Sequence, residues 1–167
     1  MGLKRFLCEK LPPPGRSTKL SDAETSHALK VLRLKAGDCV QVLDGQGKSG
    51  IGILKTRSDG VWIEITNHEE GPHAQSRGVY PISLEAAVLK GDAMEWMIEK
   101  ATELGVTHFI PLATDHTVVD TKKKGSAHFQ GRWQKISDQA LKQCGRLDRM
   151  QIHEVIELES CLLYTSP

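Results

Sequence analysis

The first half of the chain alternates hydrophobic and polar positions with the period of two that is typical of β-strands. Turn sequences that contain glycine separate the alternating segments, which favours hairpins between neighbouring strands. Another strand is expected before the proline-rich segment 11–15. The segment itself can form neither a helix nor a central strand, because its prolines lack the backbone N–H that both structures need. Short strands joined by turns at this spacing predict a small β-barrel. The predicted strands are Leu3–Cys8, Cys39–Leu43, Gly50–Leu54 and Val61–Ile65.

One helix is predicted within this barrel domain. Ser21 and Glu24 have the spacing of a capping box, in which each side chain bonds to a backbone amide near the other. Glycine is common just beyond a helix end, so Gly37 is expected to terminate the helix. One side of the helix is expected to carry the apolar residues Ala28, Val31 and Leu32.

The second half changes to alternating strand and helix, after a polar and turn-rich stretch that predicts a domain boundary. Residues 81–88 and 106–112 are apolar enough for buried strands, and a helix between them is expected to end at Gly105. A strand, a helix and a strand in this order indicate a parallel sheet. Asp92 and Glu95 repeat the capping signature at the start of this helix. Its apolar positions are Met94, Met97, Ile98, Ala101 and Leu104.

A further helix and a third strand over residues 151–156 complete the predicted α/β unit. The helix is expected to end at Gly145. Its apolar positions are Phe129, Trp133, Ile136, Ala140 and Cys144. A three-strand unit without a later helix leaves one face of its sheet uncovered. Residues 161–167 show no helical pattern and resemble a translated sequencing-adapter peptide, so they are interpreted as a non-native tail.

Composition narrows the class of protein. The 167 residues hold 22 Lys and Arg against 21 Asp and Glu, a net charge of +1, with 39% hydrophobic residues. This balance argues against a highly basic nucleic-acid tail and against a disordered chain. No apolar run approaches the ~18 residues of a membrane span, so a cytoplasmic protein without membrane contact is expected. The cysteines and histidines lack metal-ligand spacing, which predicts free thiols and no metal site.

Basic residues near the helix of the first domain are the first candidates for function. Arg33 leaves the helix beside the barrel, where it can meet a phosphate or a base edge, or else pair with Asp38. Both alternatives stay open for Arg33. His27 is expected to pack on the barrel, because most single histidines in helices are structural.

The predicted βαβ segment supplies two further lysines. Lys90 follows the carboxyl end of a strand, the edge at which open α/β sheets usually bind ligands, so it is the better functional candidate. Lys100 has the spacing to pair with Glu95 or Glu103 along its helix. In that case these charged residues would only form the solvent-exposed side of the helix.

Two residues at the end of the last helix have structural explanations. Arg146 has the position to complement the helix dipole. Cys144 is expected to pack within the apolar face of the helix rather than act as a nucleophile, since its spacing belongs to that face. The basic segment 122–124 is interpreted as a solvated loop that can add non-specific phosphate attraction. From these residues alone the function stays open.

Three blocks of residues, in order, resemble the RsmE-type ribosomal RNA methyltransferases. The first block is Arg5-Phe6, His27-x-x-x-Val31-Leu32-Arg33-x-x-x-Gly37-Asp38 and Asp44-Gly45. The second is Lys90-Gly91-Asp92-Ala93-Met94-Glu95, Lys100-Ala101-Thr102-Glu103-Leu104-Gly105-Val106 and Pro111. The third is Arg132-Trp133-x-x-Ile136, Ala140 and Gln143-Cys144-Gly145-Arg146. The resemblance extends to about residue 160.

The resemblance implies a mixed fold, with a PUA-like β-barrel for RNA binding over residues 1–76 and an α/β SPOUT domain, the trefoil-knot class, over residues 77–160. The family uses S-adenosylmethionine to methylate N3 of one uridine in 16S rRNA of the small ribosomal subunit, and it works as a homodimer. No catalytic residue can be assigned. The candidates for RNA binding that it implies are Arg5, Arg33, Lys90, Lys100 and Arg146.

The sequence departs from the family at the cofactor site. The Gly-Pro-Glu-Gly-Gly loop and the Leu-Arg-Thr-Glu-Thr-Ala segment that form the knot and its pocket do not occur here. We therefore expect an incomplete SPOUT domain in a C-terminally truncated chain that is inactive alone, although the full-length parent is an enzyme. His116 follows Asp115 where the family has Glu-Arg, so its role in RNA binding is left open. The rival hypothesis is a non-enzymatic RNA-binding barrel module, and a small-ligand α/β protein is a third.

Overall fold

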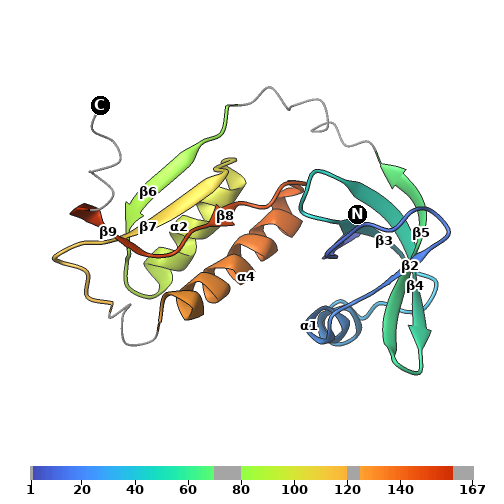
Figure 1. The fold of residues 1–167 in the computed structure, drawn as a ribbon. Helices are drawn as coiled ribbons and strands as arrows, with labels where there is room; N and C mark the ends of the chain where they lie inside the picture. Colours follow the sequence, from blue (N-terminus) through green and yellow to red (C-terminus); the bar gives the residue numbers. More distant parts are fainter. Residues whose placement is uncertain (1, 70–79, 120–124, 160–167) are drawn as a thin grey trace. The chain divides into compact units, whose positions relative to one another are not determined.

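A computed structural model describes residues 2–69, 80–119 and 125–159 (Figure 1). The chain divides into two compact units, Met1–Gly78 and Val79–Pro167. The boundary expected after residue 76 lies outside the described residues, as do the basic segment 122–124 and the expected tail 161–167.

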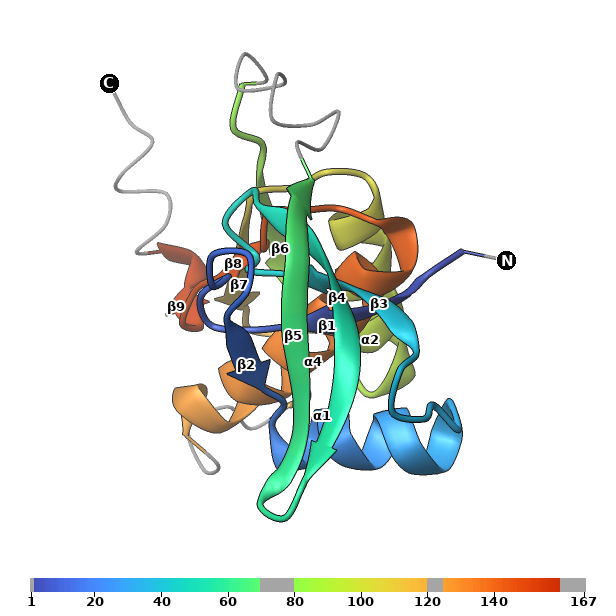
Figure 2. The ribbon, with the colours of Figure 1, turned by 90° about the vertical axis from the view of Figure 1, so that its right-hand side faces the viewer.

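The first unit is built on a five-stranded sheet, in which the long β4–β5 hairpin is the largest element (Figure 2). Strands β1 and β3 run parallel, and the other neighbours are antiparallel. The inward positions bury an apolar core that includes Phe6, Val42 and Ile63. In spatial order the strands are β1 (Lys4–Leu7), β3 (Cys39–Leu43), β4 (Ser49–Arg57), β5 (Gly60–Glu69) and β2 (Ser17–Lys19).

Four of these strands lie where the alternation predicts them, and β2 was missed. The three residues of β2 are polar and give no alternation signal, but they pair with the backbone of β5.

The turn before β4 lies at one of the glycine-containing segments where a hairpin was predicted. The buried Asp44 carboxylate accepts hydrogen bonds from the amides of Gln46, at 2.8 Å, and Lys48, at 3.0 Å. This side chain satisfies backbone groups that the tight turn leaves unpaired.

The helical segment of this unit is shorter than predicted and changes type. Helix α1 (Asp22–Ser26) begins as expected, because Ser21 Oγ accepts a hydrogen bond from the Glu24 amide at 3.3 Å. A π-helical segment, η1 (His27–Val31), follows and is capped at Leu32, so the expected end near Gly37 is wrong.

The π-turn also changes which residues face the core. The Leu32 amide donates to the His27 carbonyl five residues earlier, at 3.0 Å, which widens the turn. Ala28 is buried and Leu32 packs against the core, but Val31 is 66% exposed. The prediction that Val31 belongs to the apolar side is therefore wrong, because a wider turn rotates successive side chains away from the α-helical positions.

The second unit is a parallel α/β structure, as predicted. Its elements are β6 (Ser83–Ala87), α2 (Asp92–Glu103), β7 (His108–Ala113), α4 (Ser126–Cys144), β8 (Gln151–Ile152) and β9 (Ile156–Glu157). Strand β7 pairs with β6 on one side and with both β8 and β9 on the other. The predicted third strand is therefore present but interrupted between β8 and β9.

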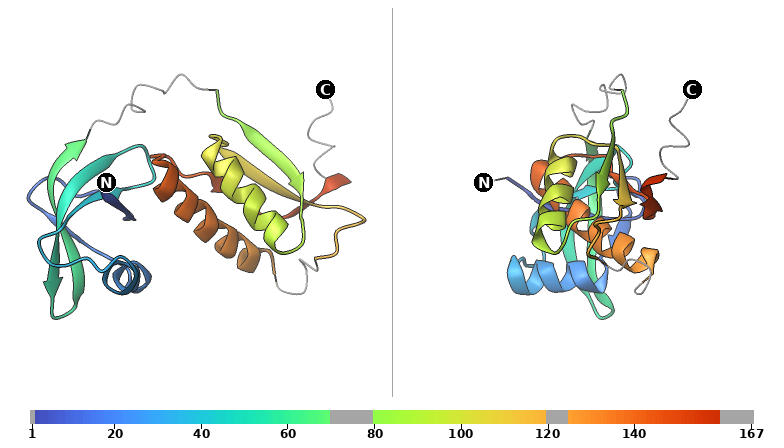
Figure 3. Two further views of the ribbon diagram at one scale, coloured as in Figure 1. Left: turned by 180° about the vertical axis from the view of Figure 1, so that it is seen from behind. Right: turned by 90° about the vertical axis from the view of Figure 1, so that its left-hand side faces the viewer.

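Helices α2 and α4 lie side by side against one face of this sheet (Figures 1 and 3). Ile98 of α2 and Trp133 of α4 share an apolar core with Phe109 of β7. Within that packing, the buried hydroxyl of Thr102 donates to the Ile98 carbonyl at 2.8 Å and lies 3.0 Å from Ser137 Oγ, which ties the two helices together.

Three details at the helix ends differ from the sequence predictions. Gly91, at φ +57°, is the N-cap of α2, so Asp92 is not the cap but the first helical residue. A left-handed backbone at the cap suits glycine and places Asp92 at the positive end of the helix dipole. Leu104 is 80% exposed, since it lies beyond the last turn of α2. Cys144 is exposed rather than packed, at the last residue of α4. Gly105 and Gly145 follow α2 and α4 as predicted.

No helix in the described ranges is long and apolar enough to cross a membrane.

Candidate functional site

Arg5 lies at the start of a polar chain on the first unit. Its Nε donates to Gln41 Oε1 at 2.8 Å, and Gln41 Nε2 donates to Glu69 Oε2 at 2.6 Å. These contacts join β1, β3 and the end of β5. The Arg5 side chain is half-buried, and the strand register places Arg5 opposite Gln41.

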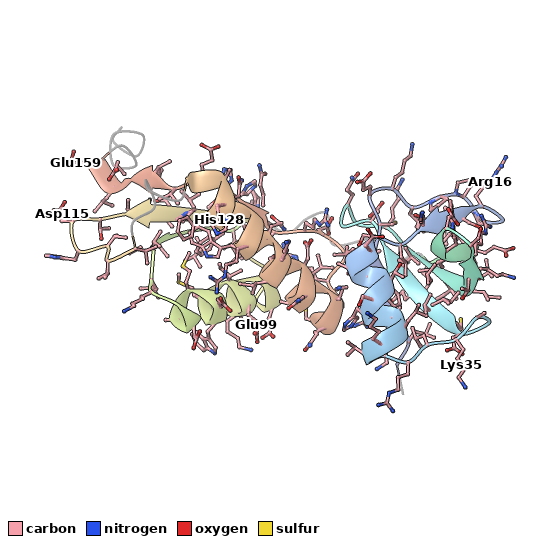
Figure 4. All side chains as sticks on the ribbon, turned by 90° about the horizontal axis from the view of Figure 1, so that it is seen from below. Arg16, Lys35, Glu99, Asp115, His128 and Glu159 are labelled. Atoms are coloured by element: carbon pink, nitrogen blue, oxygen red, sulfur yellow. The ribbon has the colours of Figure 1, made fainter. Side chains whose placement is uncertain are left out.

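Arg33 is the exposed basic residue that follows η1. Its φ of +54° is the only positive value at a non-glycine residue in the part of the chain that the structure describes. The alternative in which Arg33 pairs with Asp38 is not realised, because the Asp38 carboxylate accepts a hydrogen bond from the Lys35 amide at 2.7 Å. Figure 4 shows Lys35 on the loop that leaves η1. Non-glycine residues held at positive φ cluster at functional sites, so Arg33 is a candidate for binding.

His27 does not pack on the barrel as expected. It is exposed at the first residue of η1, and its carbonyl takes part in the π-turn. The histidine side chain is therefore available to solvent on the same surface segment as Lys30 and Arg33.

Lys90 is exposed between the end of β6 and the start of α2, at the carboxyl edge of the parallel sheet. A hollow of about 50 Å³ lies beside it, lined by Leu89, Gly91, Met94, Glu95, Val119, Phe129, Arg132 and Trp133. Arg132 of α4 pairs with Glu95 of α2 at the rim. Pockets for drug-sized ligands enclose roughly 300–1,000 Å³. This hollow is therefore too small for a nucleoside cofactor such as S-adenosylmethionine.

Lys100 is held by two carboxylates on its own helix. Its Nζ lies 2.8 Å from Glu99 Oε1 and 2.9 Å from Glu103 Oε2, while the alternative partner Glu95 pairs elsewhere. Figure 4 labels Glu99 on α2. The hydrogen bond that Lys100 donates to Glu99, followed by the one that it donates to Glu103, raises the pKa of Lys100. The charge of Lys100 is thus balanced within the unit.

The side chain of Arg146 binds backbone groups of its own unit. Its Nη1 donates to the Thr102 carbonyl at 3.1 Å and to the Val106 carbonyl at 2.6 Å. Burial lowers the pKa of the guanidinium. The sequence suggested that Arg146 complements the dipole of the helix before it, but it instead caps the end of α2, the other helix.

Sequence reasoning missed a group of residues on the outer face of the first sheet. Trp62 of β5 lies there with the guanidinium of Arg57, the end of β4, 4.5 Å from its ring centroid. The signal was present, because the alternation that buries Val61 and Ile63 necessarily directs Trp62 outward. Large aromatic residues at outward strand positions are common in binding surfaces.

Two further observations concern ions. The described ranges contain no group of three or more His, Cys, Asp or Glu side chains placed to hold a metal. His116 is exposed on the loop after β7, with no metal partner among the described residues.

Comparison with known families matches both units. The RNA methyltransferase domain family matches residues 76–166, and the RNA methyltransferase PUA domain family matches residues 20–66. Most of the five-stranded sheet therefore falls in an RNA methyltransferase PUA domain, and the parallel α/β unit falls in an RNA methyltransferase domain. The chain belongs to the RNA methyltransferase family whose curated members include ribosomal RNA small subunit methyltransferase E, as the motif blocks predicted.

Individual relatives agree with this assignment. The ribosomal RNA small subunit methyltransferase E of Synechocystis sp. is 33% identical over 127 residues, which cover 76% of this chain and 39% of that protein. The protein of the same name from Bacillus subtilis is 29% identical over 150 residues, 86% of this chain and 55% of that protein. The chain thus spans about half the length of these curated relatives.

Solved structures share the fold. The methyltransferase E of Neisseria gonorrhoeae, bound to S-adenosyl methionine, has a TM-score of 0.86 and 25% identity, covering 99% of this chain and 67% of that one. A methyltransferase from Legionella pneumophila, also with the bound cofactor, has a TM-score of 0.87 at 24% identity and the same coverages. The mixed fold with a PUA-like domain is therefore confirmed.

Proposed function

We propose that the protein to which this chain belongs transfers a methyl group from S-adenosylmethionine to N3 of a uridine in the 16S rRNA of the small ribosomal subunit. The observation that carries the proposal is the match of residues 76–166, more than half of the chain, to the RNA methyltransferase domain. The two curated relatives named above support it. The S-adenosyl methionine bound in the solved structure of the Neisseria gonorrhoeae methyltransferase E supports it as well.

The RNA substrate sets requirements that the exposed cations fit. A methyl acceptor on the Watson–Crick edge is reachable only after the base leaves its pair and stack. Such a strand is held through its phosphates, and Arg33 and Lys90 are exposed basic residues in separate units. Arg5 supplies a third cation, fixed by Gln41. These three residues are the RNA contacts that we favour.

Lys100 and Arg146 contribute less in this proposal. Lys100 is neutralised by Glu99 and Glu103, so a phosphate would have to displace two carboxylates. Arg146 is engaged by two backbone carbonyls and fixes the end of α2. Their part in RNA binding is therefore to shape the second unit rather than to contact the strand.

The described residues do not fit the cofactor by themselves. The hollow beside Lys90 is too small, and the sequence of 167 residues contains neither of the two loops that form the cofactor pocket in the family. We propose that this chain alone is inactive, and that cofactor binding, the knot and the homodimer belong to a longer protein that acts in the cytoplasm.

The experiment uses unmethylated small subunits and S-adenosylmethionine that carries a radiolabelled methyl group. A protein that also contains the two missing loops is expected to transfer about one methyl group per subunit, whereas the 167-residue chain transfers none. Calorimetry of the 167-residue chain with S-adenosylmethionine is the companion measurement, and stoichiometric binding contradicts the assignment of the pocket to the missing loops. RNA binding without methyl transfer by the longer protein supports the non-enzymatic alternative.

A further inference from the structure

The outer face of the first sheet carries an aromatic residue between two lysines. Trp62 is the central member of a row that crosses three strands, because the strand register pairs it with Lys55 of β4 on one side and Lys19 of β2 on the other. The inward neighbours of Trp62 are Val61 and Ile63, which are 1% and 0% exposed. The row therefore lies on the solvent side of the sheet.

Arg57 adds a stacked cation to this row. The centre of its guanidinium lies 4.5 Å from the Trp62 ring centroid, and Lys19 Nζ lies 6.0 Å from the same centroid. Arg57 Nη2 also donates to Ser17 Oγ at 3.4 Å, which holds the guanidinium over β2 and β5. A planar guanidinium against an indole is a stable arrangement that still presents a flat cationic surface.

Asp59, in the turn between β4 and β5, fixes the orientation of the ring. The Trp62 Nε1 donates to Asp59 Oδ1 at 3.0 Å, and Lys19 Nζ lies 3.3 Å from Asp59 Oδ2. Because the indole edge and one lysine are already oriented, less conformational entropy is lost when a ligand binds. The Trp62 ring is therefore oriented before any partner binds.

The charges on this face favour an anionic partner. Three cations, Lys19, Lys55 and Arg57, face two carboxylates, of which Asp59 pairs with Lys19 and Glu64 with Lys55 at 3.3 Å. The paired side chains are 44–52% exposed, and surface ion pairs of this kind are weak and easily rearranged. Aromatic rings beside positively charged side chains are the usual platform for single-stranded nucleic acid.

We propose that this face binds an unpaired stretch of RNA, with one base stacked on the Trp62–Arg57 pair and the neighbouring phosphates near Lys19 and Lys55. The inference rests on the proposed function in that the partner is the RNA substrate. An acidic protein segment would use the lysines but would leave the indole–guanidinium pair unused, which is why RNA is favoured.

The test measures anisotropy of a fluorescein-labelled, uridine-rich single-stranded RNA of about 12 nucleotides, mixed with the 167-residue chain at low salt and without methyl donor. Trp62→Ala is expected to weaken binding about tenfold, the size of one lost stacking interaction. Trp62→Phe, which keeps a ring but lacks Nε1, should retain most of the affinity. The matched control is Trp96→Ala, since Trp96 is a 64% exposed tryptophan of the second unit.

A second comparison tests the phosphate contacts, with Lys55→Gln set against Lys48→Gln. Lys48 is an exposed lysine just before β4, about 23 Å from Lys55 by the rise per strand residue. Lys55→Gln should reduce the slope of log affinity against log salt by about 0.7, the value for one single-strand phosphate contact. Lys48→Gln should change neither slope nor affinity.

Several results overturn the inference. The first is that the Trp62→Ala variant binds the RNA as tightly as the unsubstituted chain. The second is that Trp96→Ala lowers the RNA affinity as much as Trp62→Ala does. The third is that the unsubstituted chain binds a duplex of the same sequence more tightly than the single strand. An acidic peptide that competes as well as the RNA would also overturn it. Each leaves the methyl-transfer proposal standing, because no methyl donor is present. Conversely, a failure of methyl transfer leaves the binding result unchanged.

Discussion

The guanidinium of Arg146 lies 2.6 Å from the backbone carbonyl oxygen of Val106, at the junction between α2 and β7. The same Nη1 reaches the Thr102 carbonyl, so one side chain satisfies two acceptors at the end of a helix. Hydrogen bonds from charged donors contribute more to stability than hydrogen bonds between neutral groups. This residue therefore stabilises the second unit from a position that its sequence motif does not reveal.

Arg146→Gln is expected to lower the free energy of unfolding by about 1.5–3 kcal/mol, since hydrogen bonds to charged groups are in this range. Urea denaturation followed by circular dichroism measures the change. Lys135→Gln, at an exposed position on α4, is the matched control and should stay within about 0.5 kcal/mol of the original chain. An Arg146 variant as stable as the control would show that the two carbonyl contacts are dispensable.

Lys90→Gln and Lys100→Gln are expected to change RNA affinity to different extents, because Lys90 is exposed and Lys100 is paired with two carboxylates. Lys90 is exposed at the sheet edge, so its loss is expected to weaken RNA binding and to lower the salt slope by about 0.7. Lys100 is paired with Glu99 and Glu103, so its loss should change RNA affinity less than twofold. Filter binding at several salt concentrations checks both. Equal effects of the two substitutions would contradict the different roles assigned to them.

Two glycine substitutions should have opposite effects on stability. A Cβ at position 52 would lie 2.4 Å from Ile63 Cγ2 and 2.8 Å from the Glu64 carbonyl oxygen, so Gly52→Ala should destabilise the first unit by about 1–3 kcal/mol. A Cβ at position 131, in the interior of α4, meets nothing within 4 Å. Gly131→Ala should stabilise the second unit by about 0.5–1 kcal/mol. Thermal unfolding measures both, and the same sign for both would refute this packing argument.

Asp59 should make the β4–β5 turn sensitive to acid. The hydrogen bond from Trp62, with a further contribution from Lys19, lowers the pKa of the Asp59 carboxyl below 3.8. A group with a lowered pKa in the folded chain stabilises the fold above its unfolded pKa, about 3.9, and this contribution is lost as the pH falls through the folded value. Tryptophan fluorescence between pH 6 and pH 2 should therefore show a transition below about pH 4. Asp59→Asn should remove this transition, and its persistence in that variant would assign it to another group.

The sequence predicts elements whose pattern is local. Alternation located four strands of the first unit, and helical spacing with Gly105 and Gly145 located α2 and α4. Prediction from the sequence failed where an element depends on contacts with residues that are distant in the chain. Strand β2 exists because β5 pairs with it, and the π-turn at His27 depends on how the segment packs against the core.

The candidate site shows the same division. The position of Lys90 at the carboxyl edge of the parallel sheet followed from the predicted order of strand and helix, and the family assignment followed from ordered motif blocks. The engagement of Arg146 with Val106 could not be foreseen, because the two residues are 40 positions apart. The pair of Trp62 and Arg57 needed the hairpin register, although the outward position of Trp62 was readable from alternation.

The central claim is methylation of N3 of a uridine, and the nucleosides of small-subunit ribosomal RNA test it most directly. The RNA is isolated from cells with an intact gene for this sequence and from cells whose gene is interrupted within the codons for residues 81–112. Because a methyl group at N3 blocks Watson–Crick pairing, primer extension stops at the modified base while mass spectrometry identifies it. The account predicts one N3-methyluridine that is present with the intact gene and absent without it. An unchanged N3-methyluridine content, or the loss of a methyl group from a ribose or another base, would contradict the account.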